Sequence, residues 1–278
     1  MSYEIIIPSH RRPQALLKTL CQLPNETEIT IVFSDQEDLD EFYKFSPELW
    51  IKHSCVVSGC KSLKEKFEFI HNMPKIGNKV VIVEDDIEAF LVNVQGKLVS
   101  MSPERVGQMF EEGFEAARLS GSKIWGIAPV ANHYFMECSV EPKRQKTSKL
   151  KLCIGYCWGY IEEKDERMVP RTSNRADVER SLRFYVRDGG VARMDCYAVK
   201  TNPRTNQGGL QSEFTLDQRI QANKESVVYL LKNFPRLVEI NTKRDRAGGY
   251  EELTLAKIFD DRPNRLNLLK LLGSKLWD

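Results

Sequence analysis

The eleven residues 80–90, VVIVEDDIEAF, limit the possible folds of this chain more than any other stretch. The first four are valines and an isoleucine, a continuous apolar run typical of a strand buried on both faces of an α/β sheet. Three carboxylates, Glu84, Asp85 and Asp86, follow at once. Because open α/β sheets bind their ligands at the carboxyl ends of strands, we expect these acids at a binding site. A solvated acidic turn is the alternative interpretation of this stretch alone.

Three neighbouring carboxylates repel one another, so a positive charge is expected beside them. Hard divalent cations bind oxygen ligands, and such an ion with diphosphate oxygens in its shell would offset the repulsion. A zinc site is not expected, since the seven cysteines form no CxxC pair and the chain has only four histidines.

The chain before this stretch repeats a pattern, in which a short apolar run is followed by a segment of helical character. The apolar runs are at 3–7, 29–33 and 55–58. This order predicts an α/β fold with a mostly parallel central sheet flanked by helices, in a single domain of residues 1–278. Further along, we expect helices at 102–119, 174–186, 216–223 and 266–272, and strands at 124–130, 151–161, 191–199, 227–231 and 237–241.

The composition is that of an ordinary soluble protein, with 278 residues, 41% of them hydrophobic and 29% charged. No apolar run reaches the roughly 18 residues of a membrane helix, and no leader precedes the first strand. We therefore expect a cytoplasmic protein, or one made in the cytoplasm of a host, with no membrane partner. The sequence does not define an oligomeric state.

The charge is small in total but uneven along the chain. Residues 1–140 carry 14 basic and 20 acidic side chains, a net charge of −6. Residues 141–210 carry 15 and 9, or +6, and residues 211–278 carry 12 and 10, or +2. Basic clusters lie at 143–151 and 243–246. This asymmetry indicates a polyanionic partner for the second half, or chance variation of the surface.

A polar loop joins the first strand to a helix that begins with proline, a combination that makes an anion or nucleotide cradle. Neither a P-loop nor a GxGxxG motif occurs, so a nucleotide would be held by side chains at strand ends, such as Asp35. Lys64 or Lys66 could also face its phosphates, or could point to solvent from a helix. The loop residues are Pro8, Ser9, His10, Arg11 and Arg12.

Three aromatic residues, Tyr156, Trp158 and Tyr160, alternate along one face of the strand expected at 151–161. They could stack on an acceptor base or sugar, and they could equally form a face of the core. A base inside duplex DNA would have to be flipped out to reach them.

In order and spacing, these motifs resemble those of nucleotide-sugar glycosyltransferases of the GT-A fold. The opening IIIPSHRRP resembles their first strand and loop, and EDD resembles their DxD motif. The later ADVE, at 176–179, is similar to the acidic helix start that supplies the catalytic base in inverting members. The resemblance implies a GT-A-type fold, with a nucleotide-sugar half at about 1–130 and an acceptor half with elaborations at about 131–278.

The resemblance also implies roles for single residues. Glu84 and Asp86 would bind a divalent metal ion, Mn²⁺ or Mg²⁺, and Asp177 or Glu179 would be the catalytic base. The implied nucleotide-sugar site consists of Pro8, Ser9, His10, Arg11, Arg12, Asp35, Lys64, Glu84 and Asp85.

More closely, EDD, NRADVERSLRFYVRDGGVAR and NQGGL resemble the TET-associated glycosyltransferases, enzymes of phages and related sources. This resemblance implies a UDP-sugar donor and an acceptor that is a hydroxymethylated pyrimidine in DNA. In a phage-encoded enzyme, the host cytoplasm would be the compartment. The acceptor site would include Tyr156, Trp158, Arg175, Gly208 and Gly209.

The sequence departs from the GT-A pattern at three points. The first acidic position of the DxD motif is Glu84, and Ala176 stands where an acid often precedes the base. Many GT-A enzymes bind the metal with a later histidine, but no histidine follows His133. These departures leave the metal ligands open, as well as the choice between Asp177 and Glu179.

Other functions are compatible with the same residues. A GT-A glycosyltransferase could act on a glycan or a protein, and a fold that binds sugar nucleotides could bind nucleic acid without catalysis. A nucleotidyltransferase usually has a loop rich in glycine and lysine at its start, which is absent here. The donor sugar and the choice between inversion and retention are not defined by the sequence.

Overall fold

The structure is a computed structural model that describes residues 3–47, 52–138, 150–172, 174–201, 209, 214–241 and 252–256. The basic cluster at 243–246, the helix expected at 266–272, Gly208 and nearly all of the 143–151 cluster lie outside the described residues.

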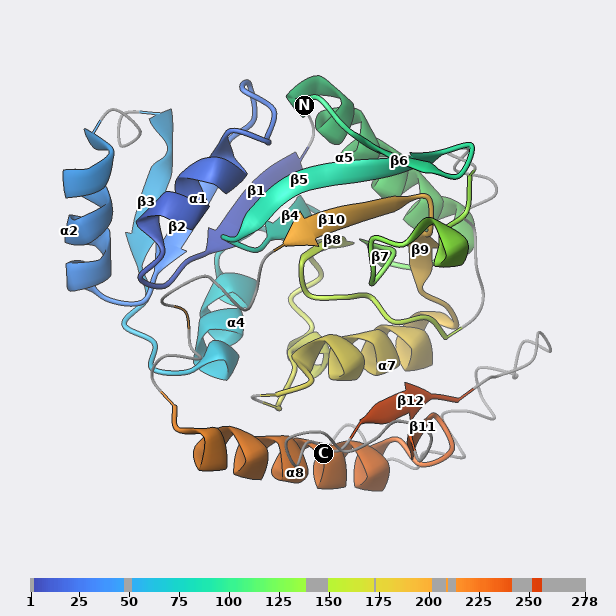
Figure 1. Ribbon diagram of the computed structural model, residues 1–278. Helices are drawn as coiled ribbons and strands as arrows, with labels where there is room; N and C mark the ends of the chain where they lie inside the picture. The colour runs from blue at the N-terminus through green and yellow to red at the C-terminus, as the bar shows by residue number, and fades with distance from the viewer. Residues whose placement is uncertain are drawn as a thin grey trace.

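A seven-stranded sheet forms the centre of the molecule, with the strand order β3-β2-β1-β4-β8-β7-β9 (Figure 1). Neighbouring strands are parallel except at β8, which runs antiparallel to both β4 and β7. The predicted α/β fold with a mostly parallel central sheet is thus confirmed. The strands are β1 Tyr3–Pro8, β2 Ile29–Phe33, β3 Ser54–Val57, β4 Lys79–Val83, β7 Ile124–Ile127, β8 Cys157–Ile161 and β9 Ala192–Met194.

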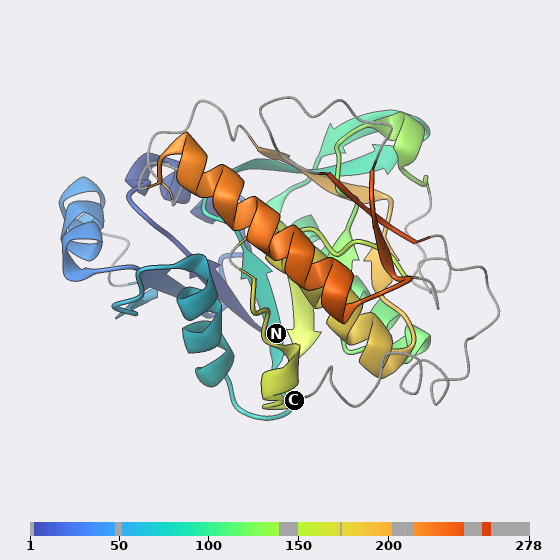
Figure 2. The same ribbon diagram turned by 90° about the horizontal axis from the view of Figure 1, so that it is seen from below.

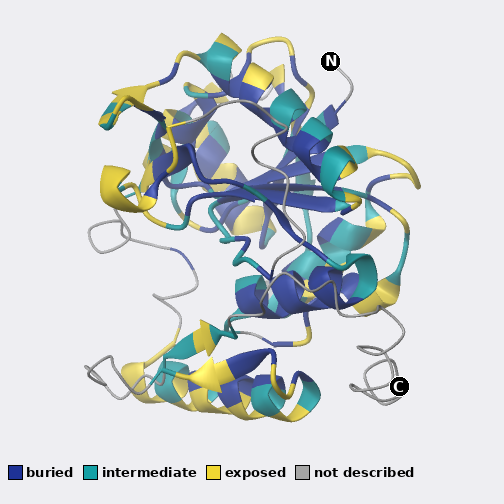
Figure 3. Ribbon diagram, turned by 90° about the vertical axis from the view of Figure 1, so that its right-hand side faces the viewer, coloured by how far each residue is buried: buried dark blue, intermediate teal, exposed yellow. Residues whose placement is uncertain are grey.

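Helices cover both faces of this sheet (Figures 1 and 3). On one face, α1 (Pro13–Leu20), α2 (Gln36–Phe45) and α5 (Pro103–Ser120) share an apolar core with a second sheet of order β10-β5-β6. The strands of this second sheet are β5 Ile87–Val94, β6 Lys97–Ser100 and β10 Tyr197–Thr201.

The opposite face carries α4 (Leu63–Asn72) and α7 (Ala176–Asp188), with α8 (Leu216–Asn233) packed outside α7 (Figure 2). A small antiparallel pair, β11 (Val238–Ile240) and β12 (Leu253–Leu255), lies beside α8. Two short 3-10 helices, η1 His133–Phe135 and η2 Glu166–Met168, interrupt the connections.

Strand β4 has the character expected of it, because its valines and isoleucine are buried on both faces of the sheet. Its side chains alternate between two apolar clusters: Val81 and Val83 belong to the α1/α5 side, Val80 and Ile82 to the α4/α7 side. Helix α5 also follows its sequence signals. The Ser102 side chain caps its first turn, and Gly121 ends it in the left-handed region with φ 68°.

The second half of the chain differs from the prediction at 216–231. A helix followed by a strand was expected, but the structure has the single helix α8. Thr215 and Gln218 form a capping box at its start, and Asn223, Ser226, Val227 and Leu230 are buried along one helical face. The adjacent valines 227 and 228 suggested a strand, but the burial follows the helical period.

Two other strand predictions were too long. The segment 191–199 is split, because Asp195 and Cys196 form a turn that passes the chain from β9 in the central sheet to β10 in the second sheet. Only the last part of 151–161 is a strand, β8, and residues 151–156 are irregular. Among the described residues, no helix is long and apolar enough to cross a membrane.

Candidate active site

The three acids follow the carboxyl end of β4, beside the loop that follows β1. The side chain of Asp85 accepts two hydrogen bonds from this loop on one oxygen, from the hydroxyl of Ser9 at 2.9 Å and from the backbone N–H of His10 at 3.3 Å. Both partners hold Asp85 against the first loop.

Arg12 bridges the two aspartates. One of its terminal nitrogens donates to Asp85 Oδ1 and to Asp86 Oδ2, each at 3.2 Å. All three side chains are largely buried. Burial strengthens the attraction between opposite charges, and a buried charge without a partner would be strongly destabilising. This guanidinium is the positive charge nearest to the two aspartates among the described residues.

A buried lysine supports the same loop from below. Lys66 of α4 donates to the carbonyl oxygen of Ser9 at 2.8 Å and to the hydroxyl of Ser34 at 2.6 Å. Ser34 also contacts Nδ1 of His10 at 2.8 Å. Burial lowers the pKa of Lys66, whereas Asp38 and Asp85 act in the opposite direction. His10 and Lys66 therefore shape the loop and fix its contact with the end of β2.

Glu84, the first of the three acids, lies where both Arg12 of the first loop and Asp177 of α7 act on its charge. Its backbone N–H donates to the carbonyl oxygen of Tyr156 at 2.9 Å, where the chain enters β8. Burial, followed by the charges of Asp86, Asp85 and Asp177, raises the pKa of Glu84 to about 8. The residue is intermediate in exposure, so it is partly accessible from the site.

Asp177 lies in the first turn of α7, where the chain enters the helix through Arg175 in the left-handed region, φ 65°. Its Oδ1 accepts from the backbone N–H of Val178 at 2.9 Å. Its charge acts on both Glu84 and Tyr156. The helix start thus brings Asp177, more than ninety residues away in the chain, to the acids that follow β4.

Glu179 occupies a different environment, although it is only two residues further along. It is fully buried, and one carboxylate oxygen accepts from the N–H groups of Arg171 and Thr172 and from the Thr172 hydroxyl, all at 2.8 Å. The other oxygen binds the guanidinium of Arg183 at 2.8 and 2.6 Å. Both oxygens are therefore occupied in fixing the segment before α7 to the helix.

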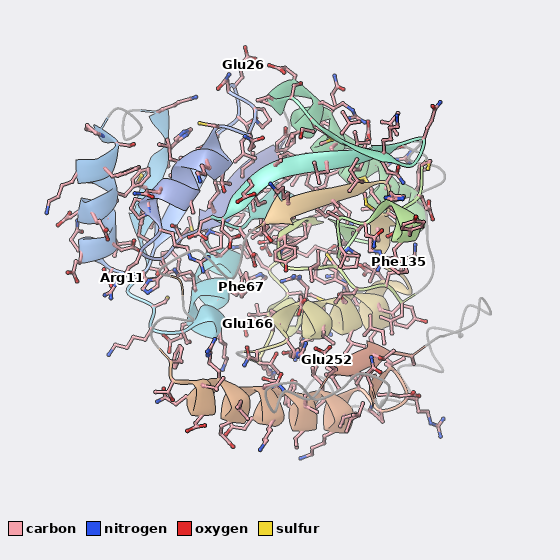
Figure 4. All side chains as sticks on the ribbon, viewed as in Figure 1. Arg11, Glu26, Phe67, Phe135, Glu166 and Glu252 are labelled. Atoms are coloured by element: carbon pink, nitrogen blue, oxygen red, sulfur yellow. The ribbon has the colours of Figure 1, made fainter. Side chains whose placement is uncertain are left out.

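Three residues predicted for the nucleotide-sugar site lie at its edge or outside it. Arg11 is on the α2 side of the loop (Figure 4), with its backbone N–H bonded to Asp38 and its guanidinium 3.8 Å from the carboxylate of Asp35. Asp35 caps the first turn of α2. Lys64 is exposed and pairs with Glu68 at 3.7 Å.

The three aromatic residues do not lie on one face of the strand, contrary to the prediction. Tyr156 precedes β8, packs against the α1/α5 core and is close to Glu84, Asp86 and Asp177. Trp158 and Tyr160 are in the opposite core and stack on each other with ring centres 5.2 Å apart. The strand begins only at Cys157, so the alternation does not extend to Tyr156.

Two residues assigned to the acceptor contact other parts of the molecule. Arg175 points to α8, where its Nε donates to Asn223 at 3.1 Å. The backbone N–H of Gly209 donates to the carbonyl oxygen of His10 at 2.9 Å. A Cβ on Gly209 would collide with the guanidinium of Arg12. Gly209 is therefore packed on the nucleotide-sugar side of the site.

The carboxylates that follow β4 are the candidate ligands for a metal ion. No group of three or more His, Cys, Asp or Glu side chains is placed to hold one among the described residues. The oxygens of Glu84 and Asp86 are the hard ligands that Mg²⁺ and Mn²⁺ prefer, and the guanidinium of Arg12 is a single positive charge shared by Asp85 and Asp86. The residues thus fit an ion that takes its remaining ligands from a bound diphosphate.

Comparisons with known proteins give no family. No protein-family model matches the chain, and no curated protein matches it. A solved structure of S. aureus TarS is similar at 13% identity and a TM-score of 0.46, over 90% of this chain and 68% of that chain. The same protein in complex with UDP gives 14% and 0.48 over the same shares.

A third solved structure is a putative nucleotide-diphospho-sugar transferase from Desulfovibrio desulfuricans. Its identity is 14% and its TM-score 0.41, over 69% of this chain and 80% of that chain. All three scores are low, so the description of the fold rests on the strand order and directions given above.

Two buried basic residues, Lys66 and Arg180, were not distinguished from their neighbours by the sequence pattern. Lys66 had been placed with its exposed neighbour Lys64, and only the buried face of α4 distinguishes them. Arg180 follows Asp177 by three positions, which puts it on the same side of α7. That spacing was the signal that could have identified it.

Proposed function

We propose that this protein is a glycosyltransferase that moves a sugar from a UDP-sugar to a hydroxymethylated pyrimidine base in DNA. The observation that carries the proposal is the meeting of Asp85, Asp86 and Arg12 with Glu84 and Asp177 at the carboxyl end of β4. Such a site offers an arginine and the carboxylate ligands for a divalent ion, which together suit a diphosphate, next to a carboxylate that can accept a proton.

The bond changes assign a role to each side. The acceptor hydroxyl attacks the anomeric carbon of the sugar while the bond from that carbon to the diphosphate oxygen breaks. Asp177 takes the hydroxyl proton, and the electron pair of the broken bond leaves with the nucleoside diphosphate. Arg12, which is held by Asp85 and Asp86, faces the leaving group.

Asp86, with Glu84, would hold a divalent ion against the same diphosphate. When bound, the ion acts as a Lewis acid that stabilises the charge of the leaving group. The loop of Ser9 and His10 is fixed by Asp85 and Lys66 before any ligand arrives, so the donor would meet a preformed surface.

The DNA acceptor is supported by the charge distribution and by the motif resemblance. The +6 of residues 141–210 and +2 of residues 211–278 sum to +8 in the half that would meet the acceptor. Contact with phosphates should make DNA affinity fall with salt, with a log–log slope of about 0.9 per contacted phosphate on duplex. A glycan or protein acceptor would lack this dependence.

The test measures donor use and acceptor together. UDP release from a panel of UDP-sugars is followed with Mg²⁺, with Mn²⁺ and with chelator, for the wild type and Asp86→Ala. Unmodified and hydroxymethylated DNA are then incubated with each donor, digested, and their nucleosides weighed. We expect a sugar increment on the modified base alone and loss of turnover in chelator. Turnover without any DNA increment favours a glycan or protein acceptor, and no turnover with salt-dependent DNA binding favours a non-catalytic protein.

A further inference from the structure

Arg180 is a buried cation that lacks the partners such a group normally has. It is only 2% exposed. Among the described residues it hydrogen-bonds only to Cys153, through the carbonyl oxygen at 3.3 Å and the thiol, and its Nε has no partner. Burying a guanidinium without an ion pair is unfavourable, so a nearby negative charge is expected to offset it.

A second arginine on the same helix shows the contrast. Arg183 is buried to the same degree, but it binds Glu179 at 2.6 Å, the carbonyl oxygen of Arg167 at 2.6 Å and the hydroxyl of Tyr229 at 2.8 Å. These partners account for the burial of Arg183 in the packing of α7. The packing of α7 alone does not explain Arg180 in the same way.

The surroundings of Arg180 point to the active site. Its guanidinium carbon lies 3.8 Å from the ring centre of Trp158 and 5.9 Å from that of Phe67, which Figure 4 shows on α4. These aromatic rings form an apolar wall on one side. The carboxylates that act on its charge are those of Asp177, one helical turn earlier, and Glu84.

We propose that Arg180 is a positioning residue that supplies the counter-charge for Asp177, the base in the proposed glycosyl transfer. Arg12 contacts Asp85 and Asp86, and the charge of Arg180 acts on the two remaining acids, Asp177 and Glu84. Because Arg180 is buried, it does not touch the substrate, and it acts on the reaction only through the carboxylate of Asp177. The inference rests on the proposed function.

The first experiment compares Arg180→Met, Arg180→Lys and a control, Arg187→Met. Arg187 lies on the same helix and stacks on Phe184, but it pairs with Asp188 and Glu163 away from the acids. UDP release from UDP-glucose, UDP-galactose and UDP-N-acetylglucosamine is measured with a hydroxymethylated duplex oligonucleotide, together with Tm.

We expect Arg180→Met to lower kcat at least about tenfold, which is less than the fall in rate expected when a general base is removed. The donor KM should stay within about twofold of the wild-type value. Arg180→Lys should recover part of the loss, and Arg187→Met should behave as the wild type. The Tm of Arg180→Met should stay the same or rise, since methionine suits the apolar wall. A fall in Tm with unchanged kcat would show a merely structural role and overturn the inference.

The second experiment is a double-mutant cycle with Asp177→Asn. If Arg180 acts through Asp177, adding Arg180→Met to Asp177→Asn should lower kcat no further. Multiplied losses would mean that Arg180 acts independently, and this would overturn the inference while leaving the proposed function in place. A wild type that releases no UDP from any of the three donors would overturn the proposed function, and the inference with it.

Discussion

The two sides of the candidate site are built differently. On the side of the first loop, Asp85 and Asp86 are tied by four hydrogen bonds to Ser9, His10 and Arg12. On the side of α7, Glu84 and Asp177 have few contacts among the described residues, and the nearby cation, Arg180, forms no ion pair with any of these residues. The first side is held rigidly before a ligand binds, while the charges of the second are balanced over longer distances.

Substitutions on the two sides should therefore affect different kinetic quantities. A substitution on the loop side should disturb geometry and therefore donor binding. A substitution on the α7 side should leave binding intact but change the charge on the reacting groups, so its effect should be on kcat. The following predictions test this division, starting with the residue that belongs to neither side.

The largest effect is expected from Glu179→Gln, and it should be on stability. The change leaves the fully buried Arg183 without its carboxylate, and breaking a buried pair in this way costs about 3–5 kcal/mol. Thermal or denaturant unfolding measures the loss. Glu115→Gln, which breaks an exposed pair with Arg118, is the control and should change Tm little. Unchanged stability of Glu179→Gln with loss of catalysis would return Glu179 to the list of possible bases.

The next effect is expected from Asp177→Asn, which removes the proton acceptor but keeps the shape of the helix start. Transfer should fall by roughly 10²-fold or more, while the affinity for UDP is unchanged. Single-turnover transfer and calorimetric titration with UDP separate the two quantities. Near wild-type transfer would remove Asp177 from the mechanism, and weaker UDP binding would contradict the division between the two sides.

A smaller effect is expected from Gly209→Ala. The residue has φ 76°, and its new Cβ would collide with the Arg12 guanidinium, displacing it from Asp85 and Asp86. Donor KM should rise by about tenfold, because backbone strain of roughly 1–2 kcal/mol adds to the displacement. Gly121→Ala carries the same strain, φ 68°, but nothing lies within 4 Å of its Cβ. Equal KM values in the two variants would show that Gly209 does not touch the donor side.

The smallest effect is expected from Arg11→Met, measured against Arg12→Met. Arg11 is exposed and lies near Asp35 and Glu37. Arg12, in contrast, binds Asp85 and Asp86. The UDP dissociation constant should change by less than about twofold for Arg11→Met, as for other exposed ion pairs, and by much more for Arg12→Met. Equal losses in the two variants would show that the loop turns differently when the donor is bound.

The sequence was most informative where one pattern fixed both the element and its surroundings. The apolar run of β4 predicted a doubly buried strand, and the acids after it are indeed at the carboxyl edge beside the first loop. The helix at 174–186 was located within two residues at each end. Periodicity and helix-start signals are local, and local signals can be read from the chain.

The sequence could not separate neighbours that point in opposite directions. Arg11 and Arg12 differ because Arg11 has φ 51°, which turns the loop between them, and no residue type signals that turn. Asp177 and Glu179 differ because the segment at 171–172 folds back onto Glu179, a tertiary contact. The core that Tyr156 packs against depends on where β8 begins, and the start of β8 is set by its pairing with β4.

The reversed direction of β8 has a consequence for how such an enzyme could diversify. Strand β7 ends at the carboxyl edge of the sheet, and β8 begins at that same edge, with Cys157 opposite Val83. The segment between them therefore leaves from and returns to the edge of the sheet where the acids after β4 lie. Its length and composition can change while both anchor points, and the sheet that carries the acids, stay the same. In the proposed glycosyltransferase, a change in this segment would alter the preference for the acceptor without rebuilding the donor side.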